Sequence, residues 1–287
     1  MPRASRRRPS TVMITLTRYL YYPLAVALAA LVVIEAGEAE RLAQAAAEMQ
    51  SLAGSTRLAW AELLERLSLS LYSGASDLKQ AYGALIGASR DAAGQVEHGA
   101  LAFAVLSLLQ LAWVAWSARG RSRVFAWHLN LVALVAFAVG IAAPMLTVVA
   151  YADVPVLGEV VLRYEAKSIV GTVLQLGSLG SWFTALLLTL FSIVTPFVKL
   201  LLSWVAASTR DPRRVVSAIE HIGKWSMTDV FVVAVLLAFL AAGPGGMTRA
   251  SLGVGLYFFA GYAIASQVAG HLLVHALRGR TTSGEQA

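Results

Sequence analysis

Long apolar segments alternate with short polar ones along most of this chain. A membrane-spanning helix needs about 20 consecutive, predominantly apolar residues, and six segments approach or exceed that length. They cover residues 12–34, 99–118, 124–150, 182–207, 227–242 and 252–277. The pattern therefore predicts an all-α, polytopic membrane helical bundle with about six transmembrane helices.

Residues 35–98, between the first two apolar segments, follow a different pattern. They contain nine acidic and five basic residues and no proline. Leucines recur there at mostly helical spacing, with charged residues between them, which is typical of amphipathic helices. We expect a periplasmic, helical insert of two or three such helices. Three roles stay open for it: a small cap packed on itself, a docking surface for a partner, or a collar in the outer leaflet.

The distribution of charge predicts how the segments cross the membrane. With both termini in the cytoplasm, the cytoplasmic segments hold thirteen basic and three acidic residues, whereas the external segments hold eight basic and twelve acidic ones. This is the positive-inside pattern of a bacterial inner-membrane protein. Residues 1–11 are then a basic cytoplasmic N-terminus and residues 278–287 a cytoplasmic tail. A cleaved signal peptide is the rival interpretation of the first segment, but that segment is long and a poor cleavage site follows it.

Composition narrows the classes of function. Hydrophobic residues make up 58% of the chain and charged residues only 14%, too few for an ordinary soluble domain. The net charge of +7 lies in clusters beside the apolar segments, so we expect no nucleic-acid partner. The chain has no cysteine and no phosphate-binding loop motif. His271 and His275 lie four residues apart without a nearby acid or third histidine, so we expect no metal site. Together with the missing motifs, this leads us to expect no cofactor and no enzymatic activity.

The fourth apolar segment carries polar residues at helical spacing. Thr189, Ser192, Pro196, Lys199 and Ser203 advance by three or four residues, which places them along one face of a helix. Ionisable residues within a membrane are costly and mark functional sites by default. Because the other faces are apolar, we expect this face to turn inward as a polar seam. Thr195 lies beside it in sequence.

Asp229 begins the fifth segment and has two interpretations. With Ser226 as N-cap, Asp229 takes the third helical position, where a capping box places its acid; this role is purely structural. Alternatively, Asp229 pairs with Lys199 as a partly buried ion pair, because both lie toward the cytoplasmic ends of consecutive segments, which usually pack as neighbours. Such a pair would either hold the bundle together or change partner or protonation during transport.

The segment from Gly223 to Val233, Gly-Lys-Trp-Ser-Met-Thr-Asp-Val-Phe-Val-Val, resembles the signature of the paraquat-inducible protein A family. It includes Trp225 and Thr228. The similarity extends upstream to Pro144 and to the string from Ser192 to Leu201, and downstream to the span that contains Gly253 and Gly255. It covers one four-helix module at about residues 124–277. We interpret the two glycines as points of close helix contact rather than as a phosphate loop.

This resemblance implies an inner-membrane subunit of an envelope lipid-transport system. Such a subunit passes membrane phospholipid to or from a periplasm-spanning MCE-family protein. It also implies that Lys199 and Asp229 belong to a polar network in the membrane, through which protons could be coupled to transport. We expect Ser192, Thr195, Ser203, Ser226 and Thr228 to contribute to this network.

The chain departs from the family pattern in ways that leave alternatives open. Many family members carry cytoplasmic Cys-x-x-Cys zinc ribbons and two four-helix modules, whereas this chain lacks cysteine and shows one module. A homodimer would supply the second module. The alternative function is a non-transporting membrane scaffold or assembly factor whose insert binds a partner. A membrane enzyme acting on lipid has little support, because no catalytic cluster lies at one interface.

Overall fold

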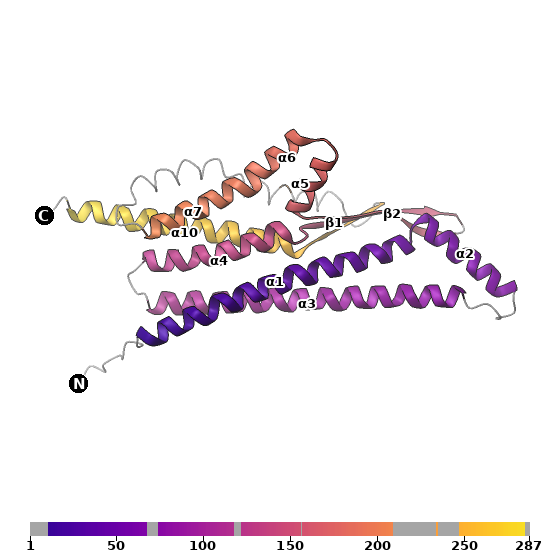
Figure 1. Ribbon diagram of the computed structural model, residues 1–287, viewed down its shortest axis with the longest axis horizontal. Helices are drawn as coiled ribbons and strands as arrows, with labels where there is room; N and C mark the ends of the chain where they lie inside the picture. The colour runs from indigo at the N-terminus through magenta and orange to yellow at the C-terminus, as the bar shows by residue number, and fades with distance from the viewer. Residues whose placement is uncertain are drawn as a thin grey trace.

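Helices that run side by side form most of the molecule (Figure 1). The computed structural model describes residues 11–67, 74–117, 122–155, 157–208, 234 and 247–284. Helix α1 (Thr11–Met49) and helix α3 (Gly74–Ser117) pack against each other, and α2 (Leu52–Leu67) lies beyond their far ends. Helix α1 begins and α10 (Val254–Gly284) ends at the opposite end of the bundle (Figure 1).

The first two predicted spans are the inner parts of much longer helices. The 44 residues of α3 extend about 66 Å at 1.5 Å per residue, about twice the thickness of the hydrocarbon core. The described part of segment 35–98 therefore consists of the outer part of α1, α2 and the first half of α3. Its periplasmic location stays a prediction. Small residues such as Ala25 allow α1 to approach α3, and the Tyr21 hydroxyl hydrogen-bonds Ser107 across the pair at 2.9 Å.

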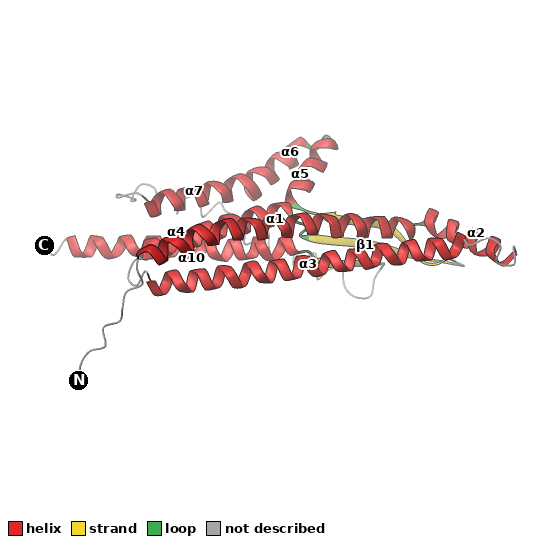
Figure 2. Cartoon of the chain, turned by 60° about the horizontal axis from the view of Figure 1, so that its bottom comes forward, coloured by secondary structure: helices red, strands yellow, loops and turns green. Residues whose placement is uncertain are grey.

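A second pair of helices packs beside the first. Helix α4 (Ser122–Ala142) lies against α10 (Figure 2). Gly140 permits close contact, because a Cβ at this position would lie 2.9 Å from backbone atoms of Phe259. The Phe137 and Tyr262 rings fill the neighbouring space, with ring centroids 4.9 Å apart. Both aromatic residues are buried, so this contact forms the centre of the apolar core.

A three-stranded antiparallel sheet corrects the expected helix boundaries. Its strands are β1 (Leu146–Val154), β2 (Gly158–Lys167) and β3 (Thr248–Leu252), in the order β2-β1-β3. The third span was expected to run to residue 150, but α4 ends at Ala142, because Pro144 cannot continue a helix. The following residues are rich in β-branched side chains, which favour strands. The sixth span likewise begins at Val254 rather than at residue 252.

Within the described ranges, five helical segments are long and apolar enough to cross a membrane. They are Leu20–Met49, Gly74–Ser117, Ser122–Ala142, Trp182–Ser208 and Val254–Val274. The segment Trp182–Ser208 follows the short helix α5 (Ile169–Ser178). The predicted span 227–242 lies outside the described residues. These segments confirm the all-α membrane class, and the three-stranded sheet adds a small β element to it.

The contact at Gly140 generates a stability prediction. A Gly140→Ala substitution pushes a methyl group into the Phe259 backbone, and overpacking of this kind costs about 1–3 kcal/mol. Gly270→Ala is the matched control on α10, because no atom lies within 4 Å of its Cβ position, and alanine favours a helix over glycine by about 1 kcal/mol. Thermal unfolding in detergent should show a lower Tm for Gly140→Ala and an equal or higher Tm for Gly270→Ala. Equal values for both variants would contradict the close contact.

Candidate functional site

Gly253 and Gly255 lie against Pro144, and all three residues belong to the stretch that resembles the paraquat-inducible protein A family. The Gly253 amide donates to the Met145 carbonyl at 2.8 Å, and the Gly255 amide donates to the Pro144 carbonyl at 2.9 Å. A Cβ on Gly253 would lie 2.2 Å from the Pro144 oxygen. A side chain at this position would therefore prevent the two backbone segments from coming this close. These contacts support the interpretation as close packing. They also fix the start of α10 to the end of α4, where the sheet begins.

The polar seam predicted in the fourth span turns inward. Ser192, Pro196, Lys199 and Ser203 are all buried, and the Lys199 residue is only 7% exposed. Thr189 is partly buried, and its hydroxyl donates to the Ala185 carbonyl at 2.8 Å. Thr195 lies off this face, where its hydroxyl donates to the Leu190 carbonyl at 2.8 Å. The inward-facing polar side of this helix, which the spacing of the polar residues predicted, is therefore confirmed for the four buried residues.

A π-helical turn interrupts the span just before Lys199. This turn, η1 (Leu190–Val194), joins α6 (Trp182–Thr189) to α7 (Thr195–Ser208). Pro196 has no amide hydrogen for the Ser192 carbonyl, and its ring would clash with that carbonyl in a regular α-helix. The wider turn relieves the clash, and the Thr195 amide bonds the Leu190 carbonyl instead. Such turns are frequent at functional sites.

Polar residues of α4 and α10 add to the buried polar groups of α7, which packs against both helices. His128 and Asn130 of α4 and Ser266 of α10 are almost completely buried. The Tyr22 hydroxyl hydrogen-bonds His128 Nδ1, whereas Asn130 Oδ1 has no hydrogen-bond partner in the described part of the chain. Sequence reasoning missed these residues, although a histidine and an asparagine within an apolar span were a usable signal.

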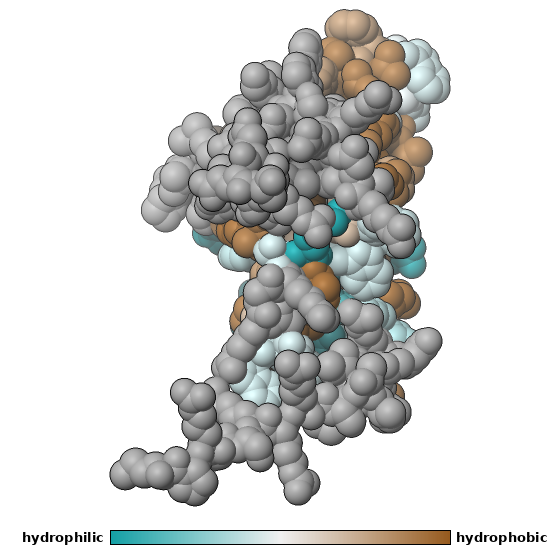
Figure 3. Space-filling view, turned by 90° about the vertical axis from the view of Figure 1, so that its left-hand side faces the viewer, coloured by the Kyte–Doolittle hydropathy of each residue, from teal (hydrophilic) through white to brown (hydrophobic). Residues whose placement is uncertain are grey.

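Hydropathy at the end of the bundle agrees with this arrangement. Figure 3 views the end where α1 begins and α10 ends, with hydrophobic residues along the upper right edge and hydrophilic ones nearer the middle. Large exposed apolar side chains on α6 and α7 include Phe183, Leu186 and Phe197. These exposed side chains on α6 and α7 suit an exterior that faces lipid.

Four predicted site residues cannot be placed. Trp225, Ser226, Thr228 and Asp229 lie outside the described residues. The structure therefore does not test whether Asp229 meets Lys199, and both the capping role and the ion pair of Asp229 stay predictions.

A large apolar cavity lies between α3 and the α4–α10 pair. Its volume is about 690 Å³, within the range of about 300–1,000 Å³ that is usual for small-molecule sites. Representative lining residues are Ala104 and Leu108 of α3, Ala133 of α4, and Phe258 and Gly261 of α10. Almost all of the described lining is hydrocarbon, and no basic residue within the described ranges contributes to it. The cavity therefore suits acyl chains better than a polar solute.

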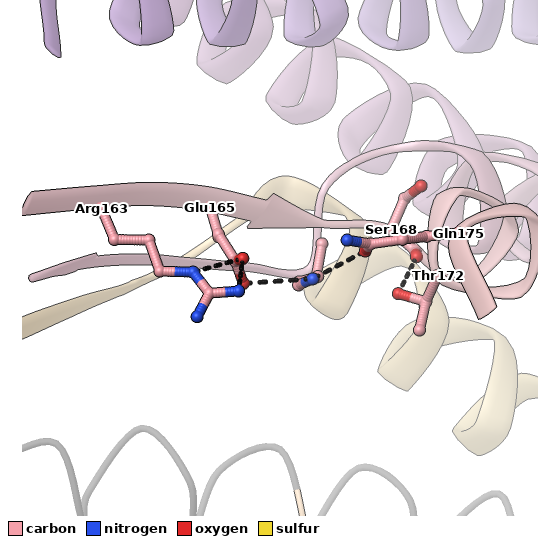
Figure 4. A network of polar contacts seen from close by, with 6 residues as sticks. Arg163, Glu165, Ser168, Thr172 and Gln175 are labelled. Atoms are coloured by element: carbon pink, nitrogen blue, oxygen red, sulfur yellow. Dashed lines mark hydrogen bonds and ion pairs between the residues drawn. The ribbon is translucent and has the colours of Figure 1, made fainter. Parts of the chain in front are cut away.

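A polar network outside the spans supports the start of α5 (Figure 4). Lys167 bridges Glu165, at 3.1 Å, and Gln175, at 2.8 Å. Ser168 caps α5 by accepting from the Gly171 amide at 3.0 Å. Burial acts to raise the pKa of Glu165, but hydrogen bonds from Lys167 and Arg163 outweigh it, so that the pKa is lowered. The network orients α5 on strand β2.

Comparison with known proteins identifies the module that holds the seam. The family model for paraquat-inducible protein A matches residues 127–276, just over half of the chain. The intermembrane transport protein PqiA of Escherichia coli (strain K12) is 37% identical over 86 residues, which cover 27% of this chain and 21% of that protein. The protein of the same name from Shigella flexneri gives the same values.

The matched stretch thus spans about a fifth of the length of these curated relatives. No solved structure matches the chain. The apolar helices and the family match make this a bacterial inner-membrane protein, although the orientation of its termini stays a prediction. Residues 127–276 include Pro144, the buried seam and both close-packed glycines, and the chain belongs to the paraquat-inducible protein A family.

Proposed function

We propose that this chain is an inner-membrane subunit of an envelope lipid-transport system. In this role it passes phospholipid to or from a periplasm-spanning MCE-type partner through a polar intramembrane network. The family membership and the name of the relatives, intermembrane transport protein, support a transport role. The protein itself would catalyse no reaction, so any chemical energy would enter through another subunit. A homodimer would supply the second module that many relatives carry.

The apolar cavity of about 690 Å³ is the observation that carries the proposal. The cavity opens to the side of the bundle, since Leu101, Leu108 and Tyr257 of its lining are exposed, so a lipid could enter it laterally. An acyl chain would fill it. The lining extends along α3 from Ala93 to Leu111, a helical length of about 27 Å, which is close to the roughly 30 Å thickness of the hydrocarbon core.

The buried seam would handle the polar part of transport, namely protons or the lipid headgroup. Lys199 places an ionisable group inside a span, and the π turn and Pro196 beside it leave the Ser192 carbonyl without its usual helical donor. Groups of this kind form proton or headgroup pathways in membrane proteins. Lys199 and Asp229 would form the centre of that network.

A scaffold or assembly factor is the second candidate function. The exposed apolar surface of α2 favours it, since Trp60 is 68% and Leu67 80% exposed. Large exposed apolar patches mark interaction sites. If this function is correct, replacing these α2 side chains disturbs activity more than changing the cavity or Lys199.

Filling the cavity tests the transport proposal. Ala104→Trp places an indole in the cavity from an exposed position on α3, so it should exclude acyl chains without overpacking the core. Ala102→Trp is the matched control, because Ala102 is also exposed on α3 and does not line the cavity. We expect Ala104→Trp to lose most of the phospholipid that copurifies with the protein and to fail to restore the envelope barrier in a deletion strain. Equal lipid content and equal complementation by the two variants would contradict the proposal.

Replacing Lys199 tests the polar network. Lys199→Ala should abolish complementation of the envelope barrier while the protein remains in the membrane, and Asp229→Ala should do the same. Ser208→Ala is a control at the exposed end of α7, where the hydroxyl only donates to the Trp204 carbonyl. Membrane fractionation and a barrier assay measure the two properties separately. Full complementation by both charge variants would remove the proposed role of this network.

A further inference from the structure

A second, smaller pocket adjoins the apolar cavity. Its volume is about 240 Å³, and it lies where α1, α3, the sheet and the start of α10 meet. The two pockets share Ala93, Val96 and Val254 as lining residues. A molecule with its apolar part in the larger cavity could therefore place a polar end in the smaller one.

The smaller pocket contains a partly buried acidic residue with a shielded, open acceptor atom. The Glu40 carboxyl group is hydrogen-bonded by the Thr147 side chain. Its Oε1 atom is shielded from solvent and has no hydrogen-bond partner in the described part of the chain. Burial raises the pKa of this carboxyl group to about 7, although the hydrogen bond from Thr147 opposes the rise, so the charged form is costly unless a further donor or a cation stabilises it. An unfilled acceptor of this kind indicates a ligand that donates hydrogen bonds.

Among the described residues, the surroundings of Glu40 are acidic and supply no cation. None of the residues that line either pocket is a lysine, an arginine or a histidine, and Glu97 adds a second carboxylate to the larger cavity. Burial raises the pKa of the neighbouring Tyr164 hydroxyl to about 12, and the Glu40 charge adds to the rise. The pocket thus favours a positively charged group over an anion.

The pocket lies at or just beyond the outer edge of the lipid headgroup region. If residues 12–34 of α1 cross the hydrocarbon core, Glu40 lies six residues, or about 9 Å, beyond its edge. The headgroup region extends roughly 5–8 Å beyond the core on each side. The acyl cavity lies on the membrane side of the pocket, since α3 and α10 both enter the bilayer from there.

We propose that the Glu40 pocket receives the primary ammonium group of an aminophospholipid whose acyl chains occupy the apolar cavity. The inference rests on the proposed function and specifies its substrate class. A primary ammonium group has three N–H donors for the open carboxylate oxygen. A quaternary ammonium group has none and is bound instead by aromatic cages, whereas Tyr164 is the one aromatic residue that lines this pocket. An anionic lipid such as phosphatidylglycerol has no positive charge to balance Glu40 and Glu97.

Headgroup selectivity tests the inference. The full-length protein is placed in nanodiscs of equimolar phosphatidylethanolamine and phosphatidylglycerol, and the lipid retained after extraction into detergent is identified by native mass spectrometry. Wild-type protein should retain mainly phosphatidylethanolamine. Glu40→Gln keeps the shape of the side chain and removes its charge, so the preference should fall roughly tenfold, as expected for the loss of one charge-assisted hydrogen bond. Glu38→Gln is the matched control, because Glu38 is exposed on the same helix.

A second series uses only the wild-type protein and does not depend on how a variant folds. Phosphatidylcholine replaces phosphatidylethanolamine in the nanodiscs, and its retention relative to phosphatidylglycerol should be much lower. Equal retention of phosphatidylethanolamine and phosphatidylcholine, or an unchanged preference in Glu40→Gln, would overturn the headgroup inference and leave the lipid-transport proposal standing. Failure of the wild-type protein to retain any phospholipid would contradict both.

Discussion

The backbone contact between the start of α10 and the end of α4 is the constraint on which the arrangement depends. Gly253 and Gly255 donate to the carbonyls of Met145 and Pro144 at a separation that leaves no room for a side chain. The contact lies where α4 ends and the sheet begins, and it fixes the start of α10 at that point. Pro144, Gly253 and Val254 also line the Glu40 pocket, so the same contact shapes the proposed headgroup site.

The helices outside the family module complete the cavity. The family match begins at residue 127, yet α3 forms one wall of the apolar cavity, and α1 supplies Glu40. The family module therefore forms these two pockets together with helices α1 and α3. That pair continues beyond the membrane to α2, so a lipid held against α3 would lie beside the route that leads away from the bilayer. This geometry links the added region to transport without requiring a second module in the same chain.

Much of the fold follows from the sequence, because long apolar segments in a membrane have few alternatives to helices. The seam was equally visible, since Ser192, Lys199 and Ser203 repeat at the helical period. The sheet could not be predicted in this way. Residues Leu146–Val154 are mostly apolar, like a membrane-spanning helix, and only Pro144 marks the change from helix to strand. The Glu40 pocket was also hidden. It joins α1, β1 and β2, and no periodic pattern relates residues that lie more than 100 positions apart. The pairing of Asp229 was predicted from adjacency alone and lies outside the described residues.

The most direct test of the account is a cryo-electron microscopy structure of the full-length protein in nanodiscs that contain phosphatidylethanolamine. The account predicts elongated lipid density in the cavity between α3 and the α4–α10 pair, with its headgroup beside the Glu40 carboxylate. A cavity closed by side chains, or one that contains only water, would contradict the central claim that this bundle holds a phospholipid.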